Sequence, residues 1–257
     1  MKRRQFIKTC AAGLALAGTT PFLTPDLPAM ETTSAEGNFS QFPQALTAKR
    51  WGMAINTKRL SPAILNKMIT ACHSYHNVPS IAGPREVKWL WADTYARSFP
   101  DQLDQYPANR LNTRSFPLLC NHCENPPCVR VCPTKATFKQ GDGTVVMDYH
   151  RCIGCRFCMA GCPYGARSFN FSDPQPFVEK PNPLFPMRMR GVVEKCTFCS
   201  ELLAKGEMPL CARTSRGAII FGDLGDPNSP LRRTLAANVA VRRKPSLGTQ
   251  PSVYYIL

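Results

Sequence analysis

Hydrophobic and polar residues follow clear periods over only part of this chain. Residues 51–59 begin with an apolar run that predicts a short strand leading into a helix. Ser61 followed by Pro62 is typical of the start of that helix, because serine caps free backbone N–H groups and proline fits the first turn. The apolar residues of the helix recur three or four positions apart, at Ile64, Leu65, Met68, Ile69 and Cys72. Residues 85–99 carry a similar pattern, which predicts a second amphipathic helix.

Shorter elements are predicted farther along the chain. Residues 136–139 and 144–148 are apolar stretches on either side of Gln140-Gly-Asp-Gly143, and this combination favours a β-hairpin. Residues 172–187 are rich in proline, which indicates an irregular surface segment. Regular structure is therefore expected in short pieces.

Composition supports a fold rich in loops. The 257 residues include 24 prolines and 16 glycines, and so many chain-breaking residues leave room mainly for short elements. The chain also has 13 cysteines, most of them in patterned groups. We therefore expect one or two domains in which metal sites contribute part of the stability.

Two segments each hold four cysteines and end in Cys-Pro. Residues 152–163 have the spacing C-x2-C-x2-C-x3-C-P, which holds iron–sulfur cubanes in bacterial ferredoxins, and residues 120–133 have the same spacing with two residues added in the middle gap. Three thiolates of a short loop can reach three corners of one cubane, whereas the fourth cysteine starts the next segment and ligates the other cluster. The crossed ligand sets are then set one, Cys120, Cys123, Cys128 and Cys162, and set two, Cys152, Cys155, Cys158 and Cys132.

Two other kinds of cysteine site are compatible with parts of this pattern. Disulfide bonds occur in exported proteins, but two four-cysteine groups that end in Cys-Pro are not the usual spacing of a disulfide framework. Zinc ribbons use pairs of C-x2-C separated by a longer loop, and each site ends at four ligands. The pattern favours cubanes, and zinc is the main alternative.

The N-terminus predicts export in the folded state. The pair Arg3-Arg4 precedes a moderately apolar stretch and then small residues and prolines, as in twin-arginine signal peptides. We assign residues 1–29 to this signal, with cleavage between 29 and 35. Cys10 lies inside the signal and is not a ligand candidate. The twin-arginine route carries folded proteins, so it suits clusters that are assembled before export.

The net charge of +15 is high for a chain of this length. A basic balance can indicate nucleic acid or anionic lipid as a partner, but the chain has no nucleic-acid motif. Instead we expect much of the charge to offset the clusters, since a cubane with four thiolates carries about −2. No segment after the signal reaches the roughly 18 apolar residues of a membrane span. We expect a periplasmic protein that is membrane-associated through its complex.

A third cysteine group, Cys196, Cys199 and Cys211, completes a recognisable pattern. With it, residues 50–225 resemble the ferredoxin-like electron-transfer subunits of membrane redox complexes, such as the iron–sulfur subunits of dimethyl sulfoxide, polysulfide, tetrathionate and nitrate reductases. That family carries four cysteine groups and four cubanes in two related two-cluster modules. The resemblance implies a loop-rich α+β fold of two tandem bacterial-ferredoxin-like modules, one inserted in the other.

This chain departs from the family pattern at four ligand positions. They are occupied here by Pro62, Leu65, Met68 and Ser215. In the family these four positions ligate one cluster, so the resemblance implies one vacated cluster site. Three of the four residues cannot ligate iron in the usual way, so we do not expect Ser215 to serve as an oxygen ligand. We expect Leu65, Met68 and Ile69 to fill the vacated site as a hydrophobic plug.

The same comparison implies a third complete ligand set and a cofactor count. Set three consists of Cys196, Cys199, Cys211 and Cys72. Together the three sets imply three [4Fe-4S] clusters. The implied domains are a linker at 30–48, an outer module at 49–114 and 173–225, an inserted module at 115–172, and a C-terminal tail at 226–257.

The resemblance implies an electron-transfer subunit without catalytic residues. Its clusters would pass electrons between a polytopic quinone-reactive membrane subunit and a c-type cytochrome subunit or another partner. The stretches His76-Asn-Val-Pro-Ser and Glu86-Val-Lys-Trp-Leu-Trp further resemble DsrO-type subunits of DsrMKJOP complexes, which act in dissimilatory sulfur metabolism. His122 is a candidate hydrogen-bond donor to a cluster, or else a solvated loop histidine. Two other functions stay open: an iron–sulfur subunit of a molybdopterin-dependent reductase that has lost one cluster, and an exported zinc or disulfide structural protein.

Overall fold

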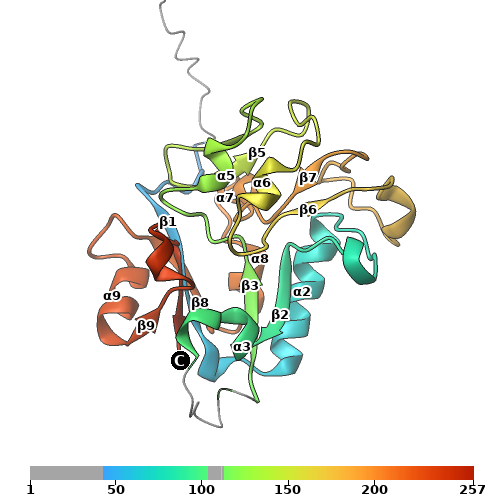
Figure 1. Ribbon diagram of the computed structural model, residues 1–257. Helices are drawn as coiled ribbons and strands as arrows, with labels where there is room; N and C mark the ends of the chain where they lie inside the picture. The colour runs from blue at the N-terminus through green and yellow to red at the C-terminus, as the bar shows by residue number, and fades with distance from the viewer. Residues whose placement is uncertain (1–42, 104–110, 112) are drawn as a thin grey trace, which may run out of the picture. The chain divides into compact units, whose positions relative to one another are not determined.

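The computed structural model describes residues 43–103, 111 and 113–257 (Figure 1). The predicted signal peptide at 1–29, Cys10 and most of the predicted linker lie outside the described residues. The described part mixes short helices with four small sheets. None of its helices has both the length and the apolar character that crossing a membrane requires.

The largest sheet has four strands in the order β8-β1-β10-β9. They are β8 (Ile219–Asp223), β1 (Trp51–Asn56), β10 (Val253–Ile256) and β9 (Ala240–Val241). Strand β1 lies antiparallel to β8 and parallel to β10, with Met53 opposite Phe221 on one side and Val253 on the other. The predicted strand at the start of residues 51–59 is confirmed, and it becomes a central strand.

Alternate residues of β1 enter two different cores, because successive side chains of a strand point to opposite faces of its sheet. Met53 and Ile55 lie in the main hydrophobic core together with Tyr255. Ala54 lies in a smaller core with Leu231 of helix α9 (Pro230–Ala237). Helix α9 therefore covers the outer face of the sheet, and the main core lies between the other face and the cysteine-rich segments.

The description of residues 226–257 as a C-terminal tail is wrong. This segment contains α9, β9 and β10, and β10 is inserted between β1 and β9 in the main sheet. Val253 and Tyr255 have no solvent-exposed surface, and the Tyr255 hydroxyl donates a hydrogen bond of 2.9 Å to the carbonyl of Pro117. The segment is part of the core, since a β-branched and two aromatic residues fill a central strand position.

The predicted helix after Ser61 is confirmed as α2 (Pro62–Tyr75), which follows the short 3₁₀ helix η1 (Thr57–Arg59). The Ser61 hydroxyl accepts a hydrogen bond of 3.3 Å from the backbone N–H of Ile64, which satisfies one of the free donors at the helix start. The buried residues of α2 are Leu65, Met68 and Cys72. This face packs against α8 (Leu210–Thr214), so α2 and α8 lie side by side.

The predicted amphipathic helix at 85–99 is wrong. The segment forms strand β2 (Leu90–Thr94), which pairs antiparallel with β3 (Ser115–Leu119), and then the short helix α3 (Tyr95–Ser98). The indole of Trp89 is buried and donates a hydrogen bond of 2.7 Å to the buried carboxylate of Glu194. Pairing with a distant strand and this anchor outweigh the local helical pattern.

The remaining elements are short. The predicted hairpin is confirmed as β4 (Thr137–Lys139) and β5 (Val145–Met147), and the proline-rich segment contains only a short 3₁₀ helix, η4 (Gln175–Phe177). A second pair joins β6 (Ser168–Phe169) and β7 (Val193–Glu194). The other elements are η2 (Gly83–Arg85), η3 (Pro100–Gln102), α5 (Pro127–Arg130), α6 (Phe157–Ala160), α7 (Ser200–Leu203) and η5 (Pro245–Leu247).

Candidate metal centres

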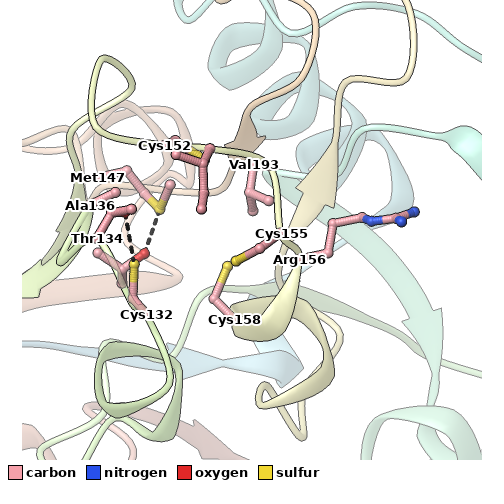
Figure 2. A pocket seen from close by; sticks show the side chains of 12 residues that line it. Cys132, Thr134, Ala136, Met147, Cys152, Cys155, Arg156, Cys158 and Val193 are labelled. Atoms are coloured by element: carbon pink, nitrogen blue, oxygen red, sulfur yellow. Dashed lines mark hydrogen bonds between the residues drawn. The ribbon is translucent and has the colours of Figure 1, made fainter. Parts of the chain in front are cut away.

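The eight cysteines of the two four-cysteine segments line two pockets. The first pocket is lined by Cys120, Cys123, Cys128 and Cys162, which are the members of set one. The second is lined by the members of set two, Cys132, Cys152, Cys155 and Cys158, and Figure 2 shows these side chains together. In each pocket, one cysteine comes from the other segment. The structure thus brings together the crossed groups that the spacing predicts.

The four cysteines of set three also lie close together. Cys72 comes from α2, Cys196 and Cys199 come from the loop before α7, and Cys211 comes from α8. Burial raises the pKa of the Cys72 thiol well above its usual value, and the neighbouring Cys196 and Cys211 raise it further. Burial likewise raises the pKa of Cys211 to about 11. As free thiols these groups are neutral at pH 7, and a bound metal cation would favour the thiolate form.

The three C-x2-C loops share one backbone feature. The residue before the second cysteine has a positive φ in each loop: His122 at 41°, Gly154 at 71° and Phe198 at 57°. This left-handed conformation turns the chain sharply, so that both cysteines of a pair face the same pocket. At Gly154, a Cβ atom would lie 2.4 Å from the carbonyl oxygen of Gly191, so only glycine fits there.

Contacts between the sets place them in a row. Burial, and after it the nearby Cys120, raises the pKa of Cys196, which makes set three a neighbour of set one. Burial also raises the pKa of Cys158, where Cys128 acts in the same direction and Arg167 opposes it. Set one therefore neighbours set two as well. The order along the row is set three, set one, set two.

Solvent exposure increases along this row. All four cysteines of set three are buried, as are three of set one. In set two only Cys158 is buried, and Cys155 is exposed. Three apolar side chains around set two are also exposed: Val131 at 38%, Ile153 at 67% and Phe157 at 59%. Set two thus lies at the accessible end of the row.

Cys132 of set two has a different environment from the other thiols. Burial opposes its ionisation, but hydrogen bonds from the backbone N–H of Thr137 and from the Thr134 hydroxyl outweigh this, and the pKa of Cys132 is lowered. The Thr134 oxygen lies 3.7 Å from the Cys132 sulfur. These donors stabilise the thiolate, which is the form that ligates metal.

Polar atoms in the set one pocket fit an anionic guest. Asn121 is buried, and neither polar atom of its amide has a hydrogen-bond partner among the described residues. The Nη2 atom of Arg167 is equally buried and without a partner. Both residues line the pocket of set one. Buried polar groups are normally hydrogen-bonded, so these atoms indicate a polar occupant, and a cubane with sulfide and thiolate sulfur would accept their hydrogen bonds.

The four positions that depart from the family pattern lie one turn away from set three. Leu65 and Met68 are buried, and Pro62 is exposed at the start of α2. Ser215 is fully buried, but its hydroxyl donates a hydrogen bond of 2.8 Å to the carbonyl of Ala212 and accepts one of 3.0 Å from the N–H of Ile219. This hydroxyl closes the turn between α8 and β8. Nothing in this arrangement resembles a ligand site.

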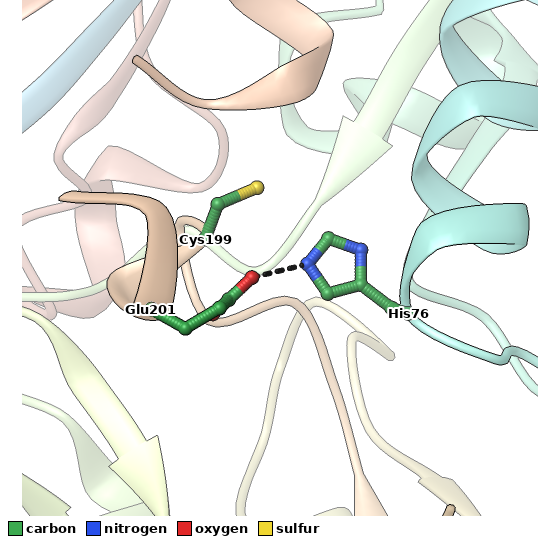
Figure 3. A group of neighbouring side chains, drawn as sticks. All are labelled: His76, Cys199 and Glu201. Carbon is green, nitrogen blue, oxygen red and sulfur yellow. Dashed lines mark hydrogen bonds and ion pairs between the residues drawn. The ribbon is translucent and has the colours of Figure 1, made fainter. Parts of the chain in front are cut away.

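A histidine that sequence reasoning treated as unremarkable lies beside set three. The imidazole of His76 is buried, and its Nε2 lies 2.9 Å from the Glu201 carboxylate, with Cys199 close by (Figure 3). Ligand atoms of these three residues lie within 4.8 Å of one another, so they could hold a metal ion. Cys199 also belongs to set three, however, and one thiolate serves one of the two sites. The Nδ1 atom of His76 lies 2.7 Å from the carbonyl of Cys72, so the imidazole links two loops of set three.

His122 is not a solvated loop histidine. It is buried, stacks on Phe198 with 3.6 Å between ring centroids, and accepts a hydrogen bond of 3.0 Å at Nδ1 from the backbone N–H of Val145. Burial and then the charge of Lys195 hold the pKa of His122 well below its usual value, so the ring is neutral. His122 and Phe198 occupy equivalent positions in two C-x2-C loops, and their stack joins set one to set three.

A family model and similar proteins agree with these sites. Residues 111–175 match the model described as a 4Fe-4S dicluster domain, and this span contains all cysteines of sets one and two. The Hdr-like menaquinol oxidoreductase iron-sulfur subunit 1 of Archaeoglobus fulgidus is 40% identical over 99% of this chain and 97% of the relative. The menaquinone reductase iron-sulfur cluster-binding subunit of Nitratidesulfovibrio vulgaris is 34% identical over 80% of this chain and 88% of the relative. One subunit of the polysulfide reductase of Wolinella succinogenes is 39% identical over 72% and 84%, respectively.

These relatives are similar to the chain over most of their own length as well as over most of this chain. The two whose names specify a subunit type are iron–sulfur subunits, and neither is a catalytic subunit. The predicted resemblance is confirmed, and the dicluster match supports [4Fe-4S] clusters as the cofactor. The chain belongs to the family of ferredoxin-like iron–sulfur electron-transfer subunits of membrane redox complexes.

Proposed function

We propose that this chain carries three [4Fe-4S] clusters and relays single electrons within a membrane-associated, quinone-linked redox complex. Set one, set two and set three would each hold one cluster. The observation that carries the proposal is the composition of the two pockets. Each is lined by four cysteines, three from one loop and one from the other segment, as two cubanes with crossed ligands require.

A third cluster at set three is supported by independent contacts. Its four cysteines are buried at the α2–α8 contact and influence one another's ionisation. The Cys72 sulfur lies 3.7 Å from Nδ1 of His76, and the same imidazole lies beside Cys199. These contacts connect residues on both sides of the segment 115–172. They support the proposal that this segment is one two-cluster module inserted into another, formed by 49–114 and 173–225.

The row of sets suggests where partners bind. Set two is the exposed end, and exposed apolar residues surround it, so a partner that exchanges electrons there could exclude water from the contact. Two relatives are named for menaquinol or menaquinone. We propose a polytopic quinone-reactive membrane subunit as one partner and a c-type cytochrome or another redox subunit as the second. A complex of the DsrMKJOP type, in dissimilatory sulfur metabolism, is the specific assignment that we propose.

Export by the twin-arginine route to the periplasm is part of this proposal. It rests on the pair Arg3-Arg4 and on the need to move a protein that already contains its clusters. Replacement of both arginines by lysine should leave the precursor in the cytoplasm with its clusters bound. Normal export of that variant, followed by cell fractionation, would contradict the assignment.

Metal and sulfide analysis of the purified chain tests the cluster count. Three cubanes predict about twelve iron and twelve acid-labile sulfide atoms per chain. About sixteen iron atoms would mean that the positions 62, 65, 68 and 215 bind a cluster after all, and about eight would mean that set three is empty. Zinc without sulfide would support the structural zinc protein instead.

A further inference from the structure

Two buried cations lie at the junctions between the cysteine sets. Arg167 has 5% exposed surface and Lys195 has none. Neither forms an ion pair with a carboxylate in the described part of the chain. A buried charge without a counter-charge is strongly unfavourable, so a nearby anion is required to explain both residues.

Arg167 lies between set one and set two. It lines the pocket of set one, and its interactions with Cys128 and Cys158 connect it with both sets. Its Nη1 donates hydrogen bonds to two neutral acceptors, the Thr137 hydroxyl at 3.1 Å and the Met147 sulfur at 3.0 Å. Its Nη2 has no partner among the described residues. The guanidinium charge is therefore held at this junction and compensated by no protein group of the described segments.

Lys195 lies between set one and set three. Its Nζ donates hydrogen bonds to the backbone carbonyls of Val145 and Cys196, and the second of these is 2.7 Å long. Val145 lines the pocket of set one, whereas Cys196 belongs to set three. The charge of Lys195 also acts on the neutral His122, whose ring stacks across the same junction. As at Arg167, the described protein acceptors around this cation are neutral.

A third buried cation shows that the chain can supply a carboxylate inside the protein. Arg188 is 3% exposed, and its Nε donates a hydrogen bond of 2.9 Å to Glu194, which is fully buried. Glu194 directly precedes Lys195 in the sequence, but the described contacts pair it with Arg188, Trp89 and Asn170. Arg243 is also buried without a carboxylate, but it packs over the ring of Tyr164 at 5.5 Å, which offers a different compensation. Among the described residues, only Arg167 and Lys195 combine burial, neutral acceptors and a place between two sets.

We propose that Arg167 and Lys195 are internal counter-charges that set the reduction potentials of the clusters on either side of them. The inference rests on the proposed three clusters. Reduction adds one negative charge to a cluster, and a fixed positive charge nearby favours that change, so each cation raises the potentials of its two neighbours. Burial makes this effect larger than that of a surface charge, because water and salt screen it less. The cluster of set one adjoins both cations and receives both contributions.

The test is an EPR-monitored redox titration of the full chain with its clusters bound. Arg167→Met should lower the potentials of the set one and set two clusters and leave that of set three nearly unchanged. Lys195→Met should lower those of set one and set three and leave that of set two nearly unchanged. Each signal can be assigned from a single Cys→Ser variant of its own set, because serine ligation perturbs that cluster most.

Three kinds of variant serve as controls. Arg167→Lys and Lys195→Arg keep the charge and should restore potentials close to those of the unchanged protein. Arg151→Gln removes a charge that directly precedes a set two cysteine but is 66% exposed, so it should shift no potential by a comparable amount. Lys195→Gln keeps a hydrogen-bond donor without the charge and replaces Lys195→Met if the latter does not fold.

The outcomes separate this inference from the proposed function. Iron and sulfide analysis of the unchanged protein decides whether three clusters are present at all. If they are present and neither Arg167→Met nor Lys195→Met shifts a potential, the counter-charge role is wrong. Equal shifts of all three clusters in both variants would also overturn it, since the effect would then not depend on position between the sets. If the neutral Lys195 variants lose clusters and Lys195→Arg keeps them, the charge is needed and the inference stands.

Discussion

Helices α2 and α8 form two neighbouring places that differ in side-chain chemistry and little else. At set three they present Cys72 and Cys211, and one helical turn away they present Met68 and Ser215. Each pair of positions is four residues apart on its helix, so both members of a pair face the same direction. All four side chains are buried, with exposed fractions between 0% and 7%.

The difference teaches that the scaffold does not by itself decide where a metal centre lies. Set three has four thiols with raised pKa values, which need a cation before they can ionise together. The neighbouring place has a thioether, an aliphatic side chain and a hydroxyl that is already used in hydrogen bonds. It is closed by ordinary packing. The predictions below test whether these two places behave as differently as their chemistry implies.

Removal of a thiol from set three should have the largest effect. Cys72→Ala should lower the iron content from about twelve to about eight atoms per chain, because three thiolates do not hold a complete cubane at this site. It should also lower the melting temperature, since metal binding and the α2–α8 contact stabilise each other. Iron analysis and thermal unfolding of the purified protein measure both. Full iron content in this variant would remove set three from the proposal.

Removal of the Ser215 hydroxyl should have an intermediate effect on stability and none on iron. Ser215→Ala leaves the buried N–H of Ile219 without its acceptor, which costs about 1–3 kcal/mol in the free energy of unfolding. Urea unfolding measures that cost, and Ser215→Thr is the matched control that keeps a hydroxyl. If Ser215→Ala instead lost four iron atoms, Ser215 would be a ligand, and the assignment of its position as vacated would be wrong.

The sequence predicted the parts of the fold that depend on neighbours along the chain. The cap at Ser61, the helix that it starts and the hairpin around residues 140–143 were all predicted, because capping and turn preferences act over a few residues. The cysteine spacing predicted which thiols line a common pocket, because a short loop limits their reach. At set three, the grouping came from the resemblance to the family.

The parts that depend on distant neighbours were missed. Strand β2 pairs with Ser115–Leu119, and β10 pairs with a strand about 200 positions earlier, and neither partner can be identified from local periodicity. The composition Val253-Tyr-Tyr-Ile256 does favour a strand, and that preference could have indicated more than a tail. Arg167 and Lys195 carried no signal at all, because burial of a charge next to a cofactor follows from three-dimensional packing.

The smallest effect is expected from a change inside the hydrophobic plug. Met68 is fully buried in the main core, and leucine has a similar volume and polarity. Met68→Leu should therefore change the free energy of unfolding by less than about 1.5 kcal/mol and leave the iron content unchanged. Urea unfolding and iron analysis make the comparison with Cys72→Ala direct, because the two residues lie one turn apart on the same face of α2. Loss of iron from Met68→Leu together with full iron in Cys72→Ala would reverse the assignment of the two places, because the methionine would then have to be a ligand and the cysteine part of the packing.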